Sequence, residues 1–203
     1  ASIYTTVHTG SALMIPERLA SDFIGISRDF LAAPGVLKLL VYQTLLPRLC
    51  PACALPLASL WRDGGLRRSS EDWRAWAGEF ARVFDADPAC LRVGNSSGCA
   101  ECRRQGLDRA GLSGHAGRTV VAEMFEPSDD AEILDCIRRR DNPALMRHLA
   151  GLSRSRADDS DMTGKAVSLC AVYKALQGEI DARFLARQFG LCGWACRRVP
   201  GAA

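Results

Sequence analysis

The sequence predicts an α/β fold whose sheet is interrupted by an inserted four-cysteine subdomain and followed by a helical bundle. Three observations support this prediction. Segments rich in β-branched and apolar residues alternate with helical patterns near the start of the chain. Two Cys-x-x-Cys doublets, Cys50/Cys53 and Cys99/Cys102, then break that alternation. Beyond residue 128, the chain carries four helical segments separated by gaps of only a few residues.

Residues 1–49 are predicted to form part of the α/β core. Residues 2–8 are typical of a strand, and the following segment places Ile15, Leu19 and Phe23 at helical spacing. This start shows no cap, turn or initiator methionine before the strand. We therefore expect the chain to begin inside a domain.

The core continues with a short helix and a second strand. Residues 27–33 predict a helix that ends before Pro34-Gly35, because proline disfavours a helical residue before it. Residues 36–49 predict a buried strand. Leu39, Val41 and Leu45 lie on one face of that strand.

Residues 50–116 change in character and predict the inserted subdomain. Residues 62–68 form a charged, glycine-bearing loop, and Ser70 with Asp72 caps a helix. The apolar stripe of that helix is Trp73, Trp76, Phe80, Val83 and Phe84. Three- and four-residue steps favour core packing over a stacking platform for ligands.

The sheet is predicted to resume after the insertion. A glycine-rich loop, 106–117, leads into a returning core strand within residues 117–127. Residues 128–190 form the helical subdomain, and residues 191–203 a tail without periodicity. The four predicted helices are 128–140, one that starts at Asn142-Pro143, 163–177 and 181–189.

Composition limits the function classes. The net charge is +3 and the arginines are scattered, which argues against a nucleic-acid groove. No apolar run is long enough to span a membrane, and the start lacks a signal-peptide pattern. Nine cysteines, an odd number, fit a reducing cytosol better than a disulfide scaffold. The thiols outside the doublets are expected to be buried or incidental; Cys192 and Cys196 lack partners for a second metal site.

The two doublets predict a zinc site. Zinc in structural sites takes four thiolates in a tetrahedron, and a two-residue spacer lets one tight turn direct both sulfurs at one metal. Cys50, Cys53, Cys99 and Cys102 are therefore the predicted ligands. A four-thiolate site has no open position, so its role is structural. Buried thiols or a redox pair are the alternatives, although redox chemistry of the thioredoxin type uses one doublet rather than two.

Ordered sequence blocks resemble the ATPases of type II secretion and type IV pilus assembly. Residues 6–12 read TVHTGSA and precede residues 17–19, ERL; together they resemble the family's histidine box, Leu-His-Thr-Asn-Asp-Ala followed by Thr-Arg-Leu. Residues 42–53, YQTLLPRLCPAC, resemble its Ala-Gln-Arg-Leu-Val-Arg-Lys-Leu-Cys-Pro-x-Cys. Residues 114–119, GHAGRT, resemble its Gly-Tyr-x-Gly-Arg-Thr, and residues 176–178 fit its Leu-x-Gly.

The resemblance runs from the first residues to about Gly190 and implies a RecA-like sheet. Departures such as Gly10 and Ser11, in place of Asn-Asp, suggest a divergent branch. The family's histidine lies near the γ-phosphate, which makes His8 the one candidate catalytic residue. Without the resemblance, a lone histidine at a strand end is more often structural.

The 203 residues contain no phosphate-binding loop of the form Gly-x-x-x-x-Gly-Lys-Ser/Thr. The nearest segment, residues 162–166, lacks the first glycine and the final hydroxyl residue. We therefore expect the C-terminal part of an ATPase that is inactive alone, with ATP and Mg²⁺ bound only in the full-length parent.

The resemblance also implies partners and a location. It predicts a hexamer at the cytoplasmic face of the inner membrane, docked on a membrane platform protein, and no nucleic acid. The competing class is a free-standing zinc-ribbon module that binds protein or nucleic acid. It is supported by the cysteine doublets and by local clusters of adjacent arginines at 67–68, 103–104, 138–140 and 197–198. A steep loss of nucleic-acid affinity with salt would favour that class.

Overall fold

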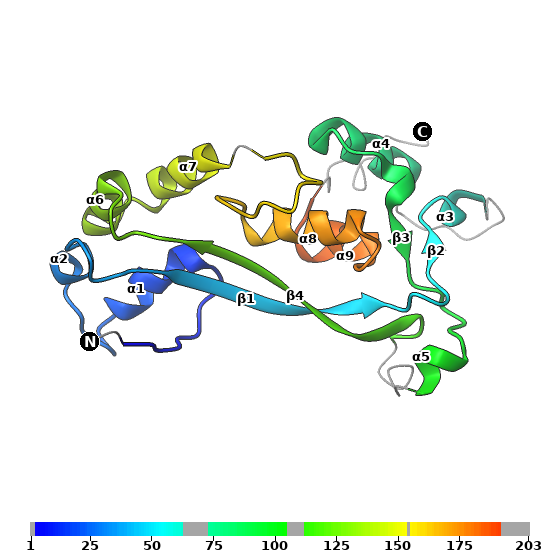
Figure 1. Ribbon diagram of the computed structural model, residues 1–203, viewed down its shortest axis with the longest axis horizontal. Helices are drawn as coiled ribbons and strands as arrows, with labels where there is room; N and C mark the ends of the chain where they lie inside the picture. The colour runs from blue at the N-terminus through cyan, green and yellow to red at the C-terminus, as the bar shows by residue number, and fades with distance from the viewer. Residues whose placement is uncertain (1–2, 63–72, 105–111, 154, 192–203) are drawn as a thin grey trace, which may run out of the picture. The chain divides into compact units, whose positions relative to one another are not determined.

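The computed structural model describes residues 3–62, 73–104, 112–153 and 155–191. The chain divides into two compact units, each built from separate stretches of sequence (Figure 1). Unit 1 comprises Ala1–Thr44, Ala122–Ser155 and Asp161–Val167. Unit 2 comprises Leu45–Val121, Arg156–Ser160 and Ser168–Ala203.

Unit 1 is mainly helical. Its helices are η1 (Ala12–Met14), α1 (Ile15–Leu19), α2 (Arg28–Leu31), α6 (Ala131–Arg139) and α7 (Asn142–Leu152). They enclose one apolar core, because each helix directs its apolar side chains inward. The core consists of Ala12, Ile15, Leu19, Leu31, Ala32, Leu40, Phe125, Ile133, Cys136, Ile137 and Leu145.

Unit 2 holds the remaining helices and a small sheet. The helices are α3 (Ser59–Arg62), α4 (Trp73–Phe84), η2 (Pro88–Cys90), α5 (Ala100–Arg104), α8 (Val167–Leu176, whose first residue is counted with unit 1) and α9 (Ala182–Gln188). Strand β2 (Leu55–Pro56) pairs antiparallel with β3 (Arg92–Val93). On α4, Trp76 and Phe80 are fully buried and stack with ring centroids 5.3 Å apart. The aromatic stripe is therefore core packing, as its spacing predicted.

Two long strands, β1 (Leu40–Leu49) and β4 (His115–Phe125), form a second two-stranded sheet. Each strand contributes residues to both units. A strand does return after the cysteine doublets, as predicted. The described residues thus form a mixed α/β fold with two small sheets.

The prediction for the first strand was wrong. Residues 3–8 adopt no regular secondary structure, and no described strand pairs with them. β-branched composition favours a strand only where a neighbouring strand satisfies the backbone. The helix that follows is also shorter than its pattern suggested, because it ends at Leu19 and leaves Phe23 exposed.

The predicted second strand exists, but its burial was assigned to the wrong face. Leu39, Val41 and Leu45 are exposed, whereas Leu40 and Leu46 are buried. Periodicity shows which residues share a face, but not which face meets the core.

Three of the four helices predicted in the C-terminal third start within three residues of the predicted positions, each after a capping aspartate. Asp130 begins α6 and accepts hydrogen bonds from the backbone N–H groups of Glu132 and Ile133. Asp141 and Asp181 cap α7 and α9 in the same way. The predicted helix 163–177 starts only at Val167. Gly164 has a φ of +67°, which is not helical, and its Cα packs closely against the backbone of residues 149–153. The predicted caps Ser70 and Asp72, and the thiols of Cys192 and Cys196, lie outside the described residues.

Candidate metal centre and histidine pocket

The structure brings the four predicted cysteines together in unit 2. The Sγ atoms of Cys50, Cys53, Cys99 and Cys102 all lie within 4.8 Å of one another. The Sγ of Cys99 is 3.7 Å from that of Cys50 and 3.8 Å from that of Cys102. A tetrahedral site with Zn–S bonds of about 2.3 Å has sulfurs about 3.8 Å apart. The cluster therefore has the dimensions of a four-thiolate metal site.

Local backbone geometry creates the two doublets. In the first, the N–H groups of Cys53 and Ala54 both donate to the carbonyl of Cys50, which closes a tight turn. In the second, the N–H of Cys99 donates to the Sγ of Cys102 over 3.1 Å, where α5 begins. Gly98 precedes this turn with a φ of +62°. Backbone donors to sulfur stabilise a thiolate, which is the form that binds a metal.

The start of β4 is bonded to the first doublet. The N–H of Cys50 donates to the carbonyl of Gly114 over 2.9 Å. Cys50 and Cys102 are buried and pack with Ala116 in one small cluster. Three distant segments of the chain thus meet at the sulfurs, so a bound metal would fix all three.

The thiols of the cluster differ in acidity. Backbone N–H groups of Cys102 and Glu101 hold the pKa of Cys99 down to about 7 despite some burial. Burial, followed by hydrogen bonding to the other thiols, raises the pKa of Cys53. Cys99 is therefore the thiol of this pair that ionises first, and a cation in the cluster would favour the thiolate form of both.

A buried polar network, which the sequence analysis missed, lies in the same unit. The Asp181 carboxylate accepts hydrogen bonds from the N–H of Gly94 at 2.7 Å and from the Arg183 side chain at 2.5 Å. His115 directs its Nε2 toward the same carboxylate at 3.8 Å. Burial alone would raise the pKa of Asp181, but hydrogen bonds and charge from Arg183, with the Gly94 N–H, lower it. The sequence analysis named position 181 only as the start of a predicted helix.

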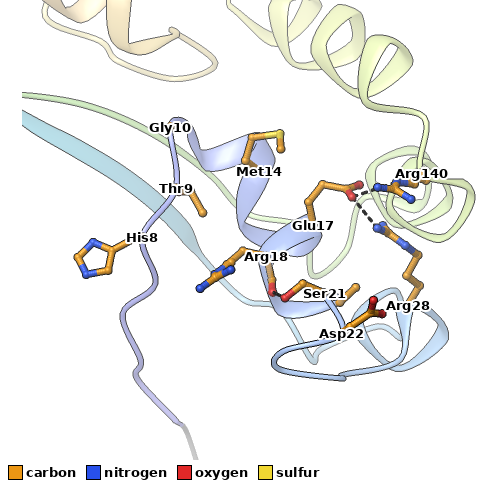
Figure 2. Close-up of a pocket in the computed structure, with 11 residues that line it drawn as sticks. His8, Thr9, Gly10, Met14, Glu17, Arg18, Ser21, Asp22, Arg28 and Arg140 are labelled. Atoms are coloured by element: carbon orange, nitrogen blue, oxygen red, sulfur yellow. Dashed lines mark hydrogen bonds and ion pairs between the residues drawn. The ribbon is translucent and has the colours of Figure 1, made fainter.

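His8 lines an open pocket of about 560 Å³ in unit 1 (Figure 2). The imidazole is exposed, and Figure 2 shows the Arg18 guanidinium extending from α1 toward the side on which His8 lies. Next to His8 in the chain, the Thr9 hydroxyl donates to the Ser11 carbonyl over 3.0 Å and so closes a turn in the loop. The lining residues are His8, Thr9, Gly10, Met14, Glu17, Arg18, Ala20, Ser21, Asp22, Arg28 and Arg140.

One wall of this pocket is an ion-pair cluster centred on Glu17. Its carboxylate accepts from Arg28 at 2.6 Å and lies 3.1 Å from the Nε of Arg140. Burial alone would raise the pKa of Glu17, but the hydrogen bond and charge of Arg28 and the charge of Arg140 lower it. With Glu17 neutralising part of the charge of Arg28 and Arg140, the pocket still carries an excess of basic groups, which suits an anion.

The comparisons with known proteins agree with the sequence blocks. Residues 2–176 match the family described as type II/IV secretion system protein. No curated protein matches the chain. Among the described helices, none has both the length and the apolar character needed to cross a bilayer. Because the match covers far more than half of the 203 residues, the chain belongs to the type II/IV secretion system protein family.

Proposed function

We propose that this chain is the C-terminal part of an ATPase that powers type II secretion or type IV pilus assembly. The observation that carries the proposal is the family match over residues 2–176, which includes both cysteine doublets and His8. The phosphate-binding loop and the carboxylate that holds Mg²⁺ would be supplied elsewhere in the parent protein, since these 203 residues contain no such loop. The chain alone then binds no ATP productively.

The cysteine cluster would hold structural Zn²⁺. The sulfur separations of 3.7 and 3.8 Å support zinc, and four protein ligands leave no position for a substrate. The ion would join the turn at Cys50, the start of α5 and the start of β4 into one rigid region. We assign to that region a surface that docks on the inner-membrane platform protein at the cytoplasmic face of the membrane, within a hexamer.

His8 would respond to nucleotide. His8, whose imidazole is exposed, and Arg18 both line an open basic pocket, where their side chains would donate hydrogen bonds to a phosphate oxygen. In the hydrolysis reaction, His8 would stabilise charge that develops on the γ-phosphate. This makes His8 the catalytic residue that this part of the protein contributes.

The test uses the complete reading frame that encodes this chain. The expressed protein is expected to hydrolyse ATP, and His8→Gln is expected to lower its kcat about 100-fold with little change in KM. His148→Gln is the matched control, because His148 also lies in unit 1 but does not line the pocket. A complete protein without ATPase activity contradicts the proposed function. An active His8→Gln protein contradicts only the role of His8.

A further inference from the structure

Glu123 on β4 makes two hydrogen bonds that the proposed function does not use. Its Oε1 accepts the backbone N–H of Ala12 at 2.7 Å, and its Oε2 accepts the backbone N–H of Val167 at 2.9 Å. Ala12 is the first residue of η1, and Val167 is the first residue of α8. All three residues belong to unit 1. One carboxylate therefore serves the first N–H of two helices that are 155 positions apart (167 − 12).

Both donors need such a partner. The first N–H groups of a helix have no acceptor within the helix, and a negative charge at that end is favourable. The side chain of Ser11, which precedes η1, makes no capping hydrogen bond. The Glu123 carboxylate supplies the missing acceptor from another element.

The loop that carries His8 ends at this hydrogen bond. His8 lies four residues before Ala12, and the turn between them is closed by the Thr9 hydroxyl on the Ser11 carbonyl. The position of the carboxylate thus sets where the loop enters η1. The other oxygen of this carboxylate accepts the N–H of Val167. If either hydrogen bond is lost, the Glu123 side chain gains rotational freedom, and the other hydrogen bond is weakened.

We infer that Glu123 is a positioning residue that couples the His8 loop to Val167, the first residue of α8. A displacement of Val167 is then transmitted through the Glu123 carboxylate to Ala12 and to the loop that carries His8. The coupling itself does not depend on nucleotide; its use in the hydrolysis cycle rests on the proposed function. In that use, a displacement of Val167 would adjust the placement of His8.

The experiment removes the N–H of Val167 and measures the hydrogen exchange of the Ala12 amide. Val167→Pro deletes only the N–H that faces Glu123, at a helix position where proline is tolerated. Val167→Ala is the matched control, because it trims the side chain and keeps the N–H. The measurements, on the ¹⁵N-labelled 203-residue chain, are amide hydrogen exchange at Ala12 and the ¹⁵N shifts of the His8 imidazole, one of only three in the sequence.

Coupling predicts that the Ala12 amide exchanges about 10-fold faster in Val167→Pro than in Val167→Ala, with a shifted His8 imidazole. A purely local cap at α8 leaves Ala12 and His8 as they are in the control. An Ala12 amide that exchanges at the control rate, or more slowly, therefore overturns the inference.

A second variant tests the shared carboxylate directly. Glu123→Gln keeps the shape of the side chain but leaves one accepting oxygen, so at least one of the two amides must lose its partner. We expect about 10-fold faster exchange at Ala12, at Val167 or at both. Unchanged exchange at both amides would show that the two bonds are not made. Neither measurement involves ATP, so failure of the coupling and failure of the proposed function are separate results.

Discussion

The cysteine cluster of unit 2 and the His8 pocket of unit 1 are opposite kinds of site. The cluster uses four ligands of one type, two of them fully buried, and leaves no space for a further group. The pocket is open, basic and lined by residues from His8 to Arg140. The first arrangement suits a permanent structural ion, and the second suits a ligand that enters and leaves. Unit 2 should therefore depend on its site for stability, whereas unit 1 should tolerate changes in its pocket.

The strongest test of this contrast removes a metal ligand. Cys50→Ser is expected to abolish metal binding and to lower the free energy of unfolding of unit 2 by about 5 kcal/mol or more, because metal binding in such sites is coupled to folding. Zinc content by mass spectrometry and urea unfolding by tryptophan fluorescence measure the two effects. The fluorescence reports on unit 2, since all four tryptophans fall within its residue ranges.

The control for that test is Cys90→Ser, because Cys90 is exposed and outside the cluster. It should retain one metal ion per chain and the wild-type unfolding curve. A Cys50→Ser protein with a full complement of zinc would show that the cluster is not the metal site. It would also remove the proposed reason for the difference between the two units.

A smaller effect in unit 2 is expected from Asp181→Asn. The Asp181 side chain is 2% exposed, and the change removes the buried negative charge that accepts from Arg183, whose side chain is 28% exposed; we expect the free energy of unfolding to fall by about 3 kcal/mol. The pKa of Asp181 is lowered by Arg183 and the Gly94 N–H against the effect of burial, so its contribution is present above the ordinary value of 3.8 and is lost as pH falls through the folded pKa.

Urea unfolding followed by tryptophan fluorescence at pH 7 and at pH 3 tests this sign. The difference in the free energy of unfolding between wild type and Asp181→Asn should be smaller at pH 3 than at pH 7. Asp129→Asn, at an exposed aspartate, is the control and should leave the free energy of unfolding unchanged at both pH values. An equal difference at both pH values would mean that the charge of Asp181 is not what stabilises the network.

The same contrast explains what the sequence could predict. The cysteine spacing and the helix starts predicted near residues 128, 142 and 181 rest on local signals, in which the chemistry depends on residues a few positions apart. In the structure the cysteines lie together, and the three helices begin at Ala131, Asn142 and Ala182, each after a capping aspartate that the sequence analysis had not singled out as a cap. Local signals therefore predicted most of the described helices and the cysteine cluster.

Signals between distant segments were missed. Asp181 reaches Gly94 over 87 positions, and Glu123 reaches Ala12 over 111, so no spacing rule connects them. The failure at residues 3–8 has the same origin, because a strand needs a partner and composition does not identify one. Residues 114–119 were recognised as a motif, but the hydrogen bonds of Glu123, four residues further on the same strand, are seen only in the folded chain.

The smallest expected effect lies in unit 1 and tests its tolerance. Glu17→Gln removes the charge that holds Arg28 and Arg140, and because Arg140 is 71% exposed and Arg28 only partly buried, water replaces much of the lost interaction. We expect the free energy of unfolding of unit 1 to fall by about 1 kcal/mol, measured by urea unfolding at pH 7 followed by far-UV circular dichroism. Since Arg28 and Arg140 lower the pKa of Glu17 against the effect of burial, this contribution is also lost as pH falls below the ordinary value of 4.5. The tryptophan transition of unit 2 is the internal control and should not move. A loss as large as that of Asp181→Asn would mean that the pocket, like the cysteine cluster, is a structural element rather than a site free to exchange its ligand.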